Sequence, residues 1–194
     1  GESFHYGVGK SVGSYKGWRD GLPPQYYPTH SNGYYTCVTH KRFTEVSCLA
    51  RPANGENYPN NRYRNPFASE VAFYKGEDGS SARMAVCYDM PCVNREAGRL
   101  WGQLGSFEND RFQGDEKRIA GVKYLRPQLP PGVPGGGHGG SHGYLTDDFI
   151  RAILLKDHKV CVDVKTALDT TIAGVYAHLS AMKGGEILKV PAVV

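Results

Sequence analysis

The sequence lacks several features that would assign it to a well-known class of protein. Its 194 residues contain no run of five or more basic residues, and the net charge is only +4, so we expect no nucleic-acid partner. No apolar stretch approaches the roughly 20 residues that span a bilayer, so we expect no membrane partner. No basic segment followed by an apolar one opens the chain, and hence no signal peptide is visible.

Cysteine is also scarce. There are five cysteines, and none of them forms a C-x-x-C motif. The odd number and wide spacing argue against a disulfide framework or a structural zinc site. Most of the cysteines lie in apolar, strand-like runs, where a free thiol behaves as a small hydrophobic group. We therefore expect mostly buried, reduced thiols at positions 37, 48, 87, 92 and 161.

What the sequence has in abundance is glycine, proline and tyrosine. Its 25 glycines and 12 prolines indicate many turns, and its 13 tyrosines exceed what a core needs, because a buried tyrosine hydroxyl requires a partner. Surfaces rich in tyrosine are suited to sugars and other polar ligands. The remaining composition, 40% hydrophobic and 22% charged, is typical of a globular domain.

The periodicity of the sequence predicts several strands followed by two helices. Alternation predicts strands at 2–13, 43–50, 98–107, 120–125 and 186–190, and a hairpin at 69–75 and 82–89 that turns at Asp78-Gly79. A short helix is expected near 32–38, capped by Thr29 or Ser31, and longer helices at 144–155 and 164–182. This order favours an α+β fold with an open, mostly antiparallel sheet and helices packed on one face.

The glycine-rich segment 135–145, GGGHGGSHGYL, contains a G-x-G-x-x-G pattern at Gly135, Gly137 and Gly140. A dinucleotide-binding loop needs a strand before the first glycine. Here the preceding residues 127–134 are rich in proline, which disfavours a buried strand. We interpret the segment as a glycine-rich approach to a helix, where backbone could also come close to a bound polyol.

Histidines are the leading candidates for chemistry. His30 lies at a loop-to-helix junction after Tyr26 and Tyr27, where an imidazole can transfer protons or simply brace the turn. His138 and His142 are four residues apart, but no carboxylate lies at ligand spacing, so we expect no metal site. His178 lies beside the apolar stripe of the last helix and is expected to be structural.

Two further side chains are candidate ligand contacts. Tyr144, at the start of the first long helix, can hydrogen-bond a ligand. Arg62 offers a planar fork of donors for an anionic or hydroxylated group, although it can equally be a solvated loop charge.

Four blocks of the sequence resemble the carboxy-terminal half of the Gfo/Idh/MocA oxidoreductases, the family of glucose–fructose oxidoreductase and inositol dehydrogenase. The similarity extends over essentially the whole chain and is greatest to the branch that includes NAD-dependent α-N-acetylgalactosaminidases. The blocks are Tyr-Pro-Thr-His-Ser at 27–31, Phe-Thr-Glu-Val-Ser-Cys at 43–48, Asn-Pro-Phe-Ala-Ser-Glu at 65–70, and Gly-Gly-Ser-His-Gly-Tyr-Leu-Thr-Asp at 139–147.

The resemblance implies that residues 1–194 are a single substrate-binding and oligomerisation domain, the C-terminal half of a two-domain protein. The Rossmann domain that would bind NAD or NADP, and its Glu-Lys-Pro segment, are absent from these residues, so we expect no cofactor binding or turnover by this chain alone. The implied partners are a sugar or polyol substrate, the missing Rossmann domain, and further copies of the chain that associate through the open sheet face.

The resemblance also assigns roles to individual residues. Family dehydrogenases carry Asp-x-x-x-His, with the histidine as acid/base; His30 matches it, but Tyr26 stands where the aspartate would be. The glycosidase branch carries Tyr-x-x-His, which Tyr27 and His30 match. His30 and Tyr27 are thus the expected catalytic residues, and Tyr144, His142, Arg62 and Tyr26 the expected substrate contacts.

These observations leave three hypotheses. The first is oxidoreduction of a sugar or polyol. The second is redox-assisted glycoside cleavage, in which NAD transiently oxidises the sugar and the aglycone is eliminated. The third is a non-catalytic carbohydrate-binding or assembly module.

Overall fold

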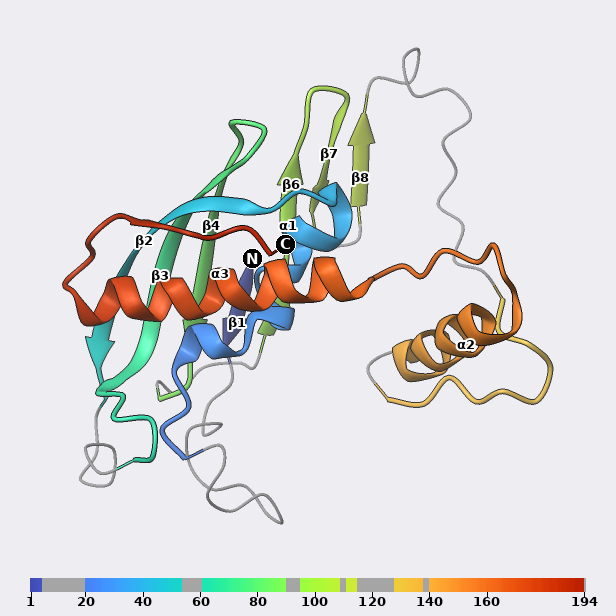
Figure 1. Ribbon diagram of the computed structural model, residues 1–194, viewed down its shortest axis with the longest axis horizontal. Helices are drawn as coiled ribbons and strands as arrows, with labels where there is room; N and C mark the ends of the chain where they lie inside the picture. The colour runs from blue at the N-terminus through green and yellow to red at the C-terminus, as the bar shows by residue number, and fades with distance from the viewer. Residues whose placement is uncertain are drawn as a thin grey trace. The chain divides into compact units, whose positions relative to one another are not determined.

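The computed structural model describes residues 1–4, 20–53, 61–89, 95–108, 111–114, 128–137 and 140–193 (Figure 1). The chain divides into two compact units. The larger unit comprises residues 1–114 and 164–194, and the smaller one comprises residues 115–163. Each unit is described by itself.

A six-stranded sheet forms the larger unit, in the order β5-β1-β4-β3-β2-β9. Every neighbouring pair in it is antiparallel except β1 and β4. The predicted α+β class with a mostly antiparallel sheet is therefore confirmed. The strands are β1 (Glu2–Phe4), β2 (Phe43–Pro52), β3 (Phe67–Gly76), β4 (Ser81–Cys87), β5 (Arg95–Ala97) and β9 (Leu188–Lys189).

The helices of this unit lie on one face of the sheet, with α3 (Val164–Met182) across the strands (Figure 1). Small residues allow α3 to approach closely: Ala173, Ala177 and Ala181 are buried against the core side chains of β2, β3 and β4. The helix ends as predicted at Gly184 and Gly185, which have positive φ, and the Gly185 amide donates to the carbonyl of Ser180.

The β3–β4 hairpin also follows its prediction. Gly79 has φ of +85° in the turn, and the Asp78 carboxylate accepts from the amide and the hydroxyl of Ser80. Of the cysteines, Cys48 and Cys87 are buried as expected, but Cys161 is exposed. Burial raises the pKa of the Cys48 thiol well above its ordinary value, which keeps that thiol unreactive.

Two predictions about local structure are wrong. The single strand expected at 98–107 is instead two strands, β6 (Arg99–Trp101) and β7 (Gly105–Glu108), which form a separate sheet with β8 (Arg111–Gly114). The Gly102 amide donates to the Gly105 carbonyl and closes a tight turn between them. The short helix α1 (Gly33–Thr39) has Asn32 at its N-cap, with no side-chain capping bond. Residues 5–13 of the strand predicted at 2–13, the strand predicted at 120–125, and Cys92 lie outside the described residues.

The smaller unit contains the helix α2 (Ser141–Leu154), which begins three residues before the predicted start. Its apolar stripe is solvent-exposed: Leu145, Phe149 and Ile153 are 60%, 63% and 64% exposed. The periodicity therefore predicted the helix correctly, but it did not indicate how much of the stripe is buried.

Candidate functional site

The segment that carries the candidate catalytic residues consists of two short 3-10 turns, η2 (Pro24–Tyr26) and η3 (Pro28–His30). Each turn has a proline at its start, where the fixed φ suits a helical turn and no amide is required. Both turns lie against α3, and η3 leads into α1. Sequence and packing thus hold this segment in one conformation.

Within this segment, His30 is engaged on its ring face and at both ring nitrogens. The Tyr27 ring stacks on the imidazole, with ring centroids 4.1 Å apart and an interplanar angle of 22°. Nδ1 lies 2.8 Å from Oγ1 of Thr29, and Nε2 lies 3.0 Å from Oε1 of Glu96. The side chains of His30 and Glu96 are 19% and 34% exposed, so solvent and a ligand can reach the pair.

Sequence reasoning missed Glu96, whose carboxylate lies 3.0 Å from the His30 imidazole. Glu96 lies on the edge strand β5, where it pairs with Ser3 of β1. Successive side chains of a strand point to opposite faces, so Glu96 faces the helices while Arg95 and Ala97 face away. The family pattern led us to look for an aspartate at position 26. No local signal marks Glu96, because its proximity to His30 depends on the long-range pairing of β1 with β5.

Tyr26, the residue in the place of that aspartate, contacts a different histidine. Its ring meets the His178 imidazole edge-on, at 5.2 Å and 79°, and meets the Tyr63 ring at 6.3 Å and 88°. Burial, followed by the nearby Glu70 carboxylate, raises the pKa of the Tyr26 hydroxyl. The guanidinium of Arg62, an exposed residue, lies 5.8 Å from the centre of the Tyr63 ring. The structure thus brings Tyr26 and Arg62 to the same aromatic neighbour, Tyr63.

His178 has a buried partner, as expected of a structural histidine. Its Nδ1 lies 2.7 Å from Oε1 of Glu70, and the two side chains are 6% and 0% exposed. The other carboxylate oxygen of Glu70 accepts from the backbone amide of Gln25, at 2.9 Å.

The remaining two candidates, His142 and Tyr144, belong to the smaller unit. Nδ1 of His142 accepts from the Gly137 amide at 3.2 Å, so the imidazole closes over its own glycine loop. A Cβ at Gly136 or Gly137 would lie 3.0 Å from atoms of His142, which explains why glycines occupy these positions. The predicted contacts of His142 and Tyr144 with substrate stay predictions.

The glycine loop does not have the structure of a dinucleotide-binding turn. Residues 128–134, which precede it, form no strand, and the Gly143 amide donates to the Gly135 carbonyl, folding the loop onto the start of α2. Among the residues that the structure describes, no three His, Cys, Asp or Glu side chains are grouped so that they could hold a metal ion. His138 lies outside the described residues.

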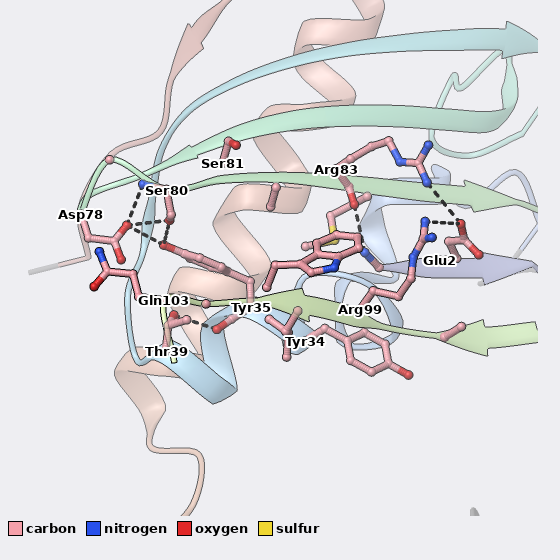
Figure 2. A pocket seen from close by; sticks show the side chains of 18 of the residues that line it. Glu2, Tyr34, Tyr35, Thr39, Asp78, Ser80, Ser81, Arg83, Arg99 and Gln103 are labelled. Carbon is pink, nitrogen blue, oxygen red and sulfur yellow. Dashed lines mark hydrogen bonds and ion pairs between the residues drawn. The ribbon is translucent and has the colours of Figure 1, made fainter. Parts of the chain in front are cut away.

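A cavity of about 960 Å³ lies elsewhere in the larger unit (Figure 2). None of the six candidate residues lines it. Figure 2 shows Arg83 and Arg99 directed toward Glu2, and Tyr35 bonded to Asp78 and Ser80. The two arginines thus pair with Glu2, and neither His30 nor Glu96 lines the cavity.

Comparison with known proteins finds relatives in fold only. No family model and no curated protein matches the sequence. Among solved structures, the chain resembles an inositol dehydrogenase homolog from Azotobacter vinelandii complexed with NADH and myo-inositol, with a TM-score of 0.60 and 14% identity over 97% of this chain and 56% of that one. It also resembles myo-inositol dehydrogenase from Lactobacillus casei, with a TM-score of 0.58 and 9% identity over 100% of this chain and 53% of that one.

A third similar structure is UDP-N-acetylglucosamine 3-dehydrogenase from Acidithiobacillus ferrooxidans, with a TM-score of 0.58 and 10% identity over 94% of this chain and 52% of that one. The chain thus spans about half the length of these dehydrogenases. At these identities the comparisons establish a shared fold. Within the described part of the chain, the helices are too short or too polar to cross a membrane.

Proposed function

We propose that this chain is the substrate-binding half of an NAD(P)-dependent oxidoreductase that acts on a sugar or polyol. The observation that carries the proposal is the His30 imidazole, which stacks on Tyr27 and lies 3.0 Å from the Glu96 carboxylate. This arrangement occurs on a fold shared with inositol and UDP-N-acetylglucosamine dehydrogenases.

In this proposal, Nε2–H of His30 donates to Glu96, and Nδ1, which otherwise meets the Thr29 hydroxyl, accepts the proton of the substrate hydroxyl as the carbinol is oxidised. Glu96 stabilises the imidazolium that forms, in the way that a carboxylate supports a catalytic histidine elsewhere. Tyr27 covers one face of the ring. Tyr26 and Arg62, which share the aromatic neighbour Tyr63, are the side chains of the larger unit proposed to contact the hydroxyl groups of the substrate.

The described residues do not themselves fit a nicotinamide cofactor, because the one G-x-G-x-x-G pattern lacks its strand and is folded onto α2. We propose that a Rossmann domain outside these 194 residues holds NAD or NADP, which supplies the hydride acceptor.

The test is His30→Ala in the full-length protein, assayed by NADH formation with myo-inositol and a panel of aldoses. Loss of a general base lowers kcat/KM by about 10²–10⁴-fold. Glu77→Gln is a matched control, because Glu77 pairs with Arg42 at the surface, 3.5 Å away, and has no proposed role. Normal kcat/KM in His30→Ala would refute the proton-transfer role.

Redox-assisted glycoside cleavage is the second candidate, and the Tyr27–His30 stack favours it because these residues have the Tyr-x-x-His spacing of the glycosidase branch. Incubation of aryl glycosides with the full-length protein and NAD distinguishes the two reactions, when released aglycone and net NADH are both measured. Release of aglycone without net NADH would exclude a simple dehydrogenase. Tight sugar binding by the 194 residues, from a gene that encodes no Rossmann segment, would instead indicate a non-catalytic module.

We also propose that copies of the chain associate through the open face of the sheet. Leu49 and Val71, which face each other across β2 and β3, are exposed together with Phe73 on the side opposite α3. An antiparallel sheet can leave one face to water, but such a face is then usually polar. Phe73→Asp should convert an oligomer to a smaller species in light scattering, and a monomeric unmodified protein would contradict the proposal.

A further inference from the structure

Glu70 is the most completely buried charged side chain among the described residues, and both of its carboxylate oxygens are used. Oε1 pairs with Nδ1 of His178 on α3, at 2.7 Å, and Oε2 accepts from the Gln25 amide of η2, at 2.9 Å. Glu70 itself lies on β3. One carboxylate therefore joins the sheet, the long helix and the turn that precedes Tyr27 and His30.

The contacts of Gln25 show how tightly that turn is held. Its side-chain amide donates to the carbonyls of Glu70 and Met84, at 3.4 and 3.3 Å, and its oxygen accepts from the Tyr74 hydroxyl at 3.4 Å. A Cβ at Gly174 of α3 would lie only 2.1 Å from the Gln25 carbonyl oxygen. The turn thus packs directly against the helix backbone.

A second attachment to α3 follows His30 in the chain. The Asn32 side-chain amide donates to the Thr170 carbonyl at 3.3 Å, and the hydroxyls of Thr36 and Thr170 are 2.6 Å apart. Tyr27 and His30 therefore lie between two attachments to the same helix. The first attachment, through Glu70, involves a buried charge. Without His178, Glu70 would be an uncompensated carboxylate in the core.

We propose that Glu70 and His178 are positioning residues, which hold the η2–η3 segment so that His30 stacks on Tyr27 and meets Glu96. Both side chains are buried, at 0% and 6% exposed. This inference rests on the proposed function in one respect, because it takes His30 as the proton-transferring group.

The first test measures the position of the His30 ring without any substrate. The centroids of the His30 and Tyr27 rings are 4.1 Å apart, so we expect the His30 ring protons to be shifted upfield. Two-dimensional ¹H–¹³C spectra of the protein resolve the imidazoles, and His30→Ala identifies the His30 signals by their loss. Tyr27→Leu gives the shift of His30 without the stack, and Glu77→Gln serves as the surface control.

We expect Glu70→Gln, which keeps the size of the side chain but loses its charge, to move the His30 signals most of the way toward their Tyr27→Leu positions. His178→Gln, which removes the other partner, should do the same. Glu77→Gln should leave them in place. If both core variants remain folded by circular dichroism and the His30 signals stay at their original positions, the inference is wrong, whatever the activity of the protein.

The second test uses kcat, KM and their pH profile in the full-length protein, with myo-inositol and NAD as the probe. A displacement of His30 of about 1 Å should lower kcat about 100-fold with little change in KM. The same Glu70→Gln change made in a His30→Ala background should have almost no effect, because residues that act as a unit are not additive. Equal losses in both backgrounds would indicate a merely structural role. Full activity of His30→Ala alone would instead contradict the proposed function.

Discussion

Two imidazole–carboxylate pairs in the larger unit have the same chemistry in opposite surroundings. His178 and Glu70 are 6% and 0% exposed, between α3 and β3, whereas His30 and Glu96 are 19% and 34% exposed, between η3 and the edge strand β5. The adjacent residues Tyr26 and Tyr27 contact one pair each, edge-on at His178 and stacked at His30. A single dipeptide therefore links a core pair to a pair that solvent can reach.

This difference in solvent exposure separates a pair suited to stabilising the fold from a pair suited to chemistry. A buried pair costs desolvation and is retained when its loss would leave an unpaired charge, so it fixes geometry. A partly exposed pair contributes little to stability, but it is available to a ligand and to proton transfer. We therefore expect changes at the first pair to lower the free energy of unfolding more than changes at the second.

The largest effect is expected when the buried pair is broken. His178→Ala leaves the Glu70 carboxylate unpaired in the core and should lower the free energy of unfolding by about 3–5 kcal/mol. Glu96→Ala, which breaks the exposed pair, should cost about 0–1 kcal/mol. Urea titrations followed by circular dichroism measure both. Similar losses in the two variants would remove the distinction between the pairs.

A smaller loss is expected at the contact between α3 and the turn that carries Tyr26. Gly174→Ala places a Cβ 2.1 Å from the Gln25 carbonyl oxygen and must displace backbone, which costs about 1–3 kcal/mol. Gly33→Ala is the control, since the nearest atom there is Sγ of Cys37 at 4.0 Å. In thermal unfolding, only Gly174→Ala should lower Tm, and a Tm at or above that of the unmodified protein would show that η2 can move away.

The sequence was sufficient for the elements whose signals are local. The β3–β4 hairpin follows from strand alternation around Asp78-Gly79, and α3 follows from its apolar periodicity and the two glycines at its end. His30 became a candidate because of its place after two tyrosines and its match to the family pattern, and its role stays a prediction. The sequence did not indicate the carboxylate partners of His30 and His178. Glu96 and Glu70 reach these histidines only through strand pairing and helix packing between distant parts of the chain.

A still smaller effect should follow removal of the ring on the exposed pair. Tyr27→Leu loses an aromatic contact with His30 worth about 1 kcal/mol, or roughly fivefold in kcat/KM of the full-length protein. Its unfolding free energy should change far less than that of His178→Ala. An unchanged kcat/KM would mean that the stack is incidental to the chemistry of His30.

The smallest effect concerns a third imidazole–carboxylate pair, in the smaller unit, where Nε2 of His158 lies 2.6 Å from Oδ1 of Asp148. The Cys161 amide, followed by His158, holds the pKa of the Asp148 carboxyl below its ordinary value. A carboxylate whose pKa is lowered by folding stabilises the fold above its unfolded pKa, and the contribution disappears as the pH falls through the folded pKa. Both side chains are partly exposed, so we expect less than about 1 kcal/mol, lost below about pH 4. The Cys161 amide resonance should titrate in that range, and Asp148→Asn should abolish the titration. A resonance that does not move would show that the bond from Cys161 is absent in solution, leaving the two pairs of the larger unit as the basis of the comparison.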